Sequence, residues 1–105
     1  MGTLSKRELD ALVEEAIVDA YDEYEQTSGF AVMIGDNVAF PFETVVLGVE
    51  VTVTGVDEIP GTGIAAVCRR GKERQCIGIL DLPLPSPPPA GSEWIAAYRH
   101  WLTGA

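Results

Sequence analysis

The sequence predicts an α+β domain in which an N-terminal helix precedes a small antiparallel β-structure. Three observations predict this class: apolar residues recur at spacings of three and four from Leu9 to Ala20, short β-rich stretches fill residues 30–82, and a second amphipathic pattern closes the chain at 92–103. No helical pattern separates the β-rich stretches, which favours a small barrel or sandwich over a parallel α/β sheet.

Length, composition and charge describe one soluble domain spanning residues 1–105. The chain is 47% hydrophobic, which suffices for a core without a metal or disulfide. Its formal net charge of -9 argues against nucleic acid and anionic membranes as partners, because both are recognised through Lys and Arg. The counterpart of the negative charge could then be a metal cation, a basic protein surface or solvent alone. No signal peptide or membrane-spanning stretch is recognisable, so we expect a cytoplasmic protein.

The predicted N-terminal helix, with an acidic exit, covers residues 4–26. Ser5 and Glu8 have the spacing of a capping box, and Leu4 and Leu9 that of a hydrophobic staple. Four carboxylates between residues 19 and 25 fall in the last turns and the exit of this helix. Like charges at helical spacings cost roughly 0.2–0.5 kcal/mol per pair, so something must offset their repulsion.

The β-rich region at 30–82 contains one clear strand and several turn signals. In "VEVTVT", Val49, Val51 and Val53 alternate with polar residues, as in a half-buried strand. The sequence at 35–37 has turn chemistry between two apolar runs, and Pro41 predicts an edge or bend.

A stiff, Pro-rich connector is predicted at 83–91, and the closing helix at 92–103 can be capped by Ser92. A connector of this composition is more often a spacer than a ligand for an SH3 or WW domain.

The two cysteines flank a basic turn. Cys68 and Cys76 are symmetric about Lys72, so a hairpin centred there would set them opposite each other. In a reducing cytoplasm we expect two small buried hydrophobes, with a redox pair as the alternative. The Arg and Lys residues between the cysteines suit a solvated tip that protects its strands, although they could also contact an acidic partner.

No catalytic constellation can be assembled. His100 is the only histidine, and the chain has no nucleophile elbow, zinc-protease motif or phosphate-binding glycine loop. We therefore expect that the protein is not an enzyme.

Clustered carboxylates are the best chemical lead, because calcium takes 6 to 8 oxygen ligands. An EF-hand is excluded: counted from Asp19, the third position is Tyr21 and the sixth is Tyr24, where that loop needs an acid and a glycine. Composition leaves both a metal site and a merely solvated acidic face open.

Residues 18–42, "VDAYDEYEQTSGFAVMIGDNVAFPF", resemble the pattern of the small bacterial and cyanobacterial calcium-binding proteins of the CcbP type. The pattern is Val-Asp-Ala-Tyr, a Glu four residues after the Tyr, Gly-aromatic, an acidic turn and Phe-Pro-Phe. The matching residues are Val18, Asp19, Ala20, Tyr21, Glu25, Gly29, Phe30, Asp36, Phe40, Pro41 and Phe42. "VDE" at 56–58 and "YRHWL" at 98–102 are weaker echoes.

The resemblance implies a cytoplasmic calcium buffer or sensor, with an N-terminal helix on an SH3-like antiparallel β-barrel and a short C-terminal helix. It implies that acidic loops outside any EF-hand hold the ion. The implied ligands are Asp19, Glu25 and Asp36, with Asp22, Glu23 and Asn37 nearby and Asp57 and Glu58 as a second site. One departure is Gly35, because the family often has an acid there.

The alternative is an SH3-like protein-interaction module that binds no metal. In this interpretation exposed aromatic rings of Phe40 and Phe42 grip a peptide, and the acidic residues only solvate the surface. No protein partner can be named from the sequence.

Overall fold

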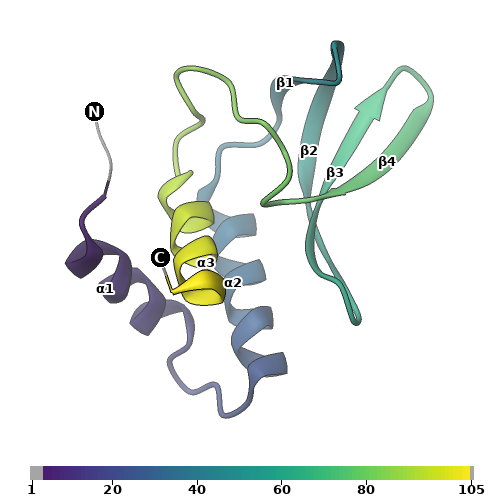
Figure 1. Cartoon of the computed structure of the whole chain (residues 1–105). Helices are drawn as coiled ribbons and strands as arrows, with labels where there is room; N and C mark the ends of the chain where they lie inside the picture. The colour runs from purple at the N-terminus through teal and green to yellow at the C-terminus, as the bar shows by residue number, and fades with distance from the viewer. Residues whose placement is uncertain (1–3, 105) are drawn as a thin grey trace.

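A computed structural model describes residues 4–104 as three helices and a four-stranded antiparallel sheet (Figure 1), which confirms the α+β class. The elements in chain order are α1 (Lys6–Ala16), α2 (Glu23–Asn37), β1 (Phe42–Val46), β2 (Val49–Ile59), β3 (Gly63–Arg70), β4 (Glu73–Gly78) and α3 (Glu93–Thr103). The helices lie together on one side of the molecule and the sheet on the other. None of the helices in this part of the chain is long and apolar enough to cross a bilayer.

Helix α1 begins as predicted but ends early. The Ser5 hydroxyl accepts a hydrogen bond from the Glu8 amide at 3.1 Å, and the Glu8 carboxylate accepts one from the Ser5 amide at 2.9 Å, which completes the capping box. The helix ends at Ala16, and Asp19 adopts a left-handed conformation with φ 63°. The prediction that this helix continues into the acidic residues of 4–26 is therefore wrong, because a second helix begins at Glu23.

Helix α2 occupies residues for which the sequence predicted a strand and a turn. Asp22 is its N-cap, and the Asp22 carboxylate accepts a hydrogen bond from the Glu25 amide at 2.8 Å. Phe30 and Ile34, one helical turn apart, are both fully buried. The predicted β-stretch from residue 30 and the predicted turn at 35–37 are both wrong. Buried side chains in α2 recur every four residues along one helical face, whereas a strand would bury every second residue.

The strands form an open antiparallel sheet in the order β1-β2-β3-β4. Over the described residues β1 and β4 are not paired with each other, so the SH3-like barrel is not confirmed. The predicted alternation in β2 is present: Val53 is fully buried, and its neighbour Thr54 is exposed. A two-residue turn of Leu47 and Gly48, both with positive φ, joins β1 to β2.

The three helices pack against one another beside the sheet (Figure 1). Helix α2 lies on β2 and β3, and α3 packs against α2 and α1. Helix α1 packs on these two helices and not on the sheet, which corrects the predicted arrangement of an N-terminal helix on a barrel. The ring of Phe30 joins the layers, since its centroid lies 5.5 Å from that of Tyr98 and 5.1 Å from that of Trp101.

The Pro-rich connector leads from β4 back to the helices and is anchored at several points. The Thr44 hydroxyl donates to the Pro83 carbonyl at 2.6 Å, and the Ala39 amide donates to the Ala90 carbonyl at 2.8 Å. Helix α3 follows, which confirms the short C-terminal helix, although the Ser92 side chain makes no capping hydrogen bond.

The cysteines lie on the predicted hairpin but not opposite each other. Cys68 pairs with Gln75, and Cys76 pairs with Val67, so the register is one residue away from the symmetric one. The two side chains therefore lie on opposite faces: Cys68 is buried, Cys76 is exposed, and both are free thiols. The buried-hydrophobe prediction is right for Cys68 and wrong for Cys76. Burial also raises the pKa of the Cys68 thiol.

Candidate calcium site

The acidic cluster lies at the beginning of a helix and not at the end of one. Asp19 and Asp22 belong to the connection between α1 and α2, and Glu23 and Glu25 belong to the first turn of α2. All four side chains are exposed. Negative charge is stabilised by the dipole at a helix N-terminus, so the fold offsets part of the repulsion without any ion.

Two of these carboxylates also bond to the backbone. Asp22 caps the Glu25 amide, and the Glu25 carboxylate accepts a hydrogen bond from the Tyr21 amide at 2.8 Å. These bonds define where α2 starts. Asp22 and Glu25 therefore have a structural role whether or not calcium is bound.

Asp36 and Asn37 lie at the opposite end of α2. Residues 22 and 36 are both at the limits of this helix, which rises 1.5 Å per residue, so they are about 21 Å apart. The Asn37 amide group donates to the Met33 carbonyl at 2.8 Å. The structure thus does not bring Asp36 together with Asp19 and Glu25 in one site.

Asp57 and Glu58 lie on β2 where it faces the beginning of α2. The Ser28 hydroxyl is 2.9 Å from each Glu58 carboxylate oxygen, and this hydrogen bond ties α2 to the sheet. Glu58 is partly buried, whereas Asp57 is exposed and accepts a hydrogen bond from the Glu58 amide at 3.0 Å.

Glu23 and Glu58 line the same hollow, which we call the α2 hollow. It has a volume of about 390 Å³ and lies between the start of α2, the β2–β3 turn and the end of α3. The lining residues with side-chain oxygens are Glu23, Tyr24, Thr27, Glu58, Thr62 and Tyr98. Carboxylates that sequence analysis assigned to two separate sites therefore meet at one place.

Tyr98 forms the buried side of the α2 hollow. Burial raises the pKa of Tyr98, and the negative charge of Glu58 raises it further. The phenol is thus neutral at physiological pH, when its oxygen is a neutral donor or acceptor. Thr27 lies one helical turn after Glu23, and Tyr98 begins the "YRHWL" echo, but no local pattern marks either as a ligand or indicates that they share a hollow with Thr62.

The donors of the α2 hollow match calcium in type but only partly in number. Carboxylate, hydroxyl and carbonyl oxygens are the ligands that calcium prefers. Within residues 4–104, however, no group of three or more His, Cys, Asp or Glu side chains is arranged to hold a metal ion. The two carboxylates would have to be supplemented by neutral oxygens to reach calcium's usual 6 to 8 ligands.

The other residues that the sequence singled out, His100, Phe40 and Phe42, make contacts within the fold. His100 is buried between α1 and α3, where its Nε2 lies 2.7 Å from an Asp10 carboxylate oxygen. The hydrogen bond from His100, with a second from Lys6, lowers the pKa of Asp10. The rings of Phe40 and Phe42 stack at 5.8 Å and pack against the core, so they do not form the exposed peptide grip of the alternative hypothesis.

Comparison with known families agrees with the resemblance in the sequence. The chain matches the family model for CcbP, described as calcium binding, over residues 10–102. Comparisons with curated proteins and with solved structures found no significant match. Because the match runs from α1 to the end of α3, it covers the whole fold and not one motif. The chain therefore belongs to the CcbP family of calcium-binding proteins.

Proposed function

We propose that the chain is a cytoplasmic calcium-binding protein, a buffer or sensor, that holds its ion outside any EF-hand and has no enzymatic activity. The observation that carries this proposal is the family match over residues 10–102. The acidic composition supports it, since 16 Asp and Glu against 7 Lys and Arg favour cations electrostatically. The two free thiols support a reducing compartment.

The α2 hollow is the site that we favour. Glu23 and Glu58 converge there from different elements, and Thr27, Thr62 and the carbonyls of the β2–β3 turn offer neutral oxygens. Asp19 and Asp22 lie at the same end of α2, where they add negative potential around the ion. Asp36 and Asn37, about 21 Å along the helix, take no part.

A pair of charge-matched variants tests both the function and the position of the site. Glu58→Gln removes one charge from the α2 hollow but keeps an oxygen that can accept from Ser28. Asp36→Asn removes one charge from the far end of α2. Calcium affinity is measured by titration calorimetry after treatment with a chelator, with magnesium as the ion control.

We expect Glu58→Gln to weaken calcium binding by more than tenfold, which corresponds to about 1.4 kcal/mol, because it removes one of only two carboxylates that line the hollow. Asp36→Asn should change affinity less than threefold. Equal losses in both variants would contradict the position of the site, and the absence of calcium binding in the wild type would contradict the function.

A further inference from the structure

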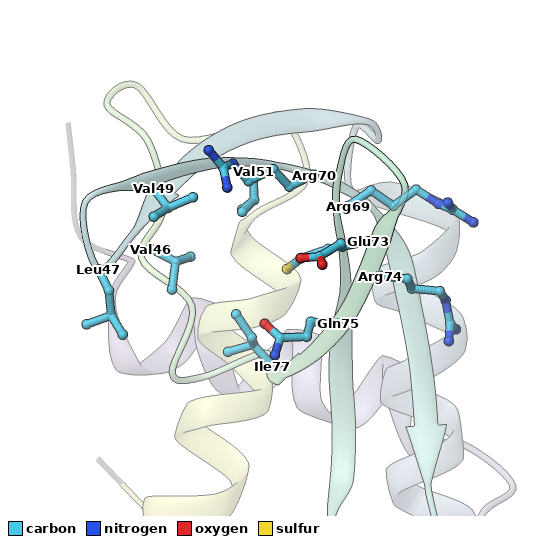
Figure 2. A pocket seen from close by; sticks show the side chains of 11 residues that line it. Val46, Leu47, Val49, Val51, Arg69, Arg70, Glu73, Arg74, Gln75 and Ile77 are labelled. Carbon is cyan, nitrogen blue, oxygen red and sulfur yellow. The ribbon is translucent and has the colours of Figure 1, made fainter.

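A second hollow lies at the other end of the molecule, between the tips of the two hairpins. It has a volume of about 590 Å³, and its apolar lining is Val46, Leu47, Val49, Val51 and Ile77. Figure 2 shows the valines of β1 and β2 facing Ile77 of β4 across the opening. We call this surface the hairpin groove.

The hairpin groove is the uncovered continuation of the core face of the sheet. Val49 and Val51 lie on the same face of β2 as the fully buried Val53, because side chains alternate along a strand. The helices cover Val53 but do not reach the hairpin tips (Figure 1). Leu47 is 98% exposed, and it also holds a left-handed conformation with φ 51°. An apolar residue in such a position gains nothing within its own molecule.

The rim of the hairpin groove is basic although the protein is acidic. Four of the chain's seven Lys and Arg residues lie within residues 69–74. Arg69, Arg70 and Arg74 line the groove together with Glu73, so its charged lining has a net charge of +2. Arg70 and Glu73 are strand partners on the groove face, whereas the Arg69 and Arg74 side chains point outward from the rim (Figure 2). A symmetric dimer through this face would bring two surfaces of the same net positive charge together, which is less favourable than contact with an acidic surface. The surface instead fits an acidic segment that also carries exposed apolar side chains.

The chain itself contains such a segment at residues 18–25, here called the acidic aromatic segment. Tyr21 is 87% exposed, and Val18 and Tyr24 are each 67% exposed, among four exposed carboxylates. Tyrosine is enriched at protein interfaces, where its ring and hydroxyl both find partners. The segment begins α2 at one end of the molecule and the hairpin tips lie at the other (Figure 1), so it cannot reach the groove of its own copy.

We propose that copies of this protein associate head to tail, with the acidic aromatic segment of one copy docked in the hairpin groove of the next. Such a contact joins two different surfaces, so it leaves one free groove and one free segment at the ends. The assembly therefore grows into short chains or closes into a ring. Because opposite charges meet at the rim, salt weakens the contact.

Two variants each remove one side of the contact and leave the carboxylates of the α2 hollow in place. The groove variant is Leu47→Asn with Arg70→Glu, since asparagine tolerates the left-handed turn better than leucine and the Arg70 side chain lies on the groove face. The segment variant is Val18→Ser with Tyr21→Ser, at two exposed positions that do not line the α2 hollow. Arg7→Glu on α1 is the control for a change of surface charge. Circular dichroism and thermal melts verify that all of them fold.

The measurement is sedimentation velocity over a wide range of protein concentration, at low salt and in chelator, so its outcome is independent of the proposed calcium site. We expect the wild type and Arg7→Glu to associate beyond a dimer and each double variant to remain monomeric. An equimolar mixture of the two double variants should form dimers only, because it contains just one intact groove and one intact segment. A monomeric wild type, association of either double variant alone, or a mixture that stays monomeric would overturn the proposal.

Discussion

The contact between α1 and α2 at Gly29 allows a direct test of the packing of the helices. A Cβ atom at Gly29 would lie 2.1 Å from the carbonyl oxygen of Ala16, whereas real contacts of this kind are not shorter than 3.0 Å. Gly29→Ala therefore requires the end of α1 to move by about 0.9 Å. Gly35 lies in the same helix, and there the nearest atom to an added Cβ is a Val56 methyl at 3.8 Å, an ordinary contact.

The magnitudes follow from these distances. Overpacking of this kind costs about 1–3 kcal/mol, whereas alanine is favoured over glycine in a helix by about 0.8–1.0 kcal/mol. We therefore expect Gly29→Ala to lower the free energy of unfolding by up to about 2 kcal/mol and Gly35→Ala to raise it by as much as about 1 kcal/mol. Urea denaturation followed by the fluorescence of Trp94 and Trp101 measures both. A Gly29→Ala variant as stable as Gly35→Ala would refute the close packing of α1 on α2.

Three further predictions concern single side chains. Thr44→Val should lower the free energy of unfolding by about 1–3 kcal/mol in urea denaturation, because it leaves the Pro83 carbonyl without its hydrogen bond. The His100 bond holds the pKa of Asp10 below its ordinary 3.8, so the stabilisation that it contributes is present above pH 3.8 and lost as the pH falls through the lowered pKa. The difference in unfolding free energy between wild type and Asp10→Asn should therefore shrink in that acidic range. A thiol reagent should label the native protein once, at the exposed Cys76, by mass spectrometry, and labelling of both thiols would contradict the burial of the other.

The start of α1 and the strand β2 were predictable from local signals. The capping box of Ser5 and Glu8 acts within one turn, so it forms as the sequence indicates. The alternating valines of β2 likewise predict a strand with one buried face. Such features depend on neighbours a few residues apart.

The error at α2 came from weighing β-propensity above helical spacing. Asp22 and Glu25 repeat the capping pattern seen at the first helix, and Phe30, Ile34 and Val38 follow at intervals of four. Those signals were present in the sequence, but the β-branched residues and the Gly-Asp-Asn of 35–37 suggested a strand and a turn. Burial of Phe30 against Tyr98 and Trp101 decided the outcome, and these partners are some 70 residues away.

The candidate site could be predicted in type but not in grouping. Composition and the family pattern indicated acidic residues as calcium ligands, and both Glu23 and Glu58 were among them. Glu23 and Glu58 share a hollow because α2 packs on β2. The spacing of residues along the chain does not reveal this contact. Asp36 was grouped with Asp19 because the helix between them was not recognised.

Equilibrium dialysis of the chelator-treated protein against calcium, with magnesium in excess, tests the central claim most directly. The wild type should retain calcium in a stoichiometric amount despite the magnesium, because flexible oxygen sites of this kind suit the larger ion, and Glu58→Gln should retain markedly less. A wild type that retains no calcium above the level of the dialysis buffer would contradict calcium binding by this chain.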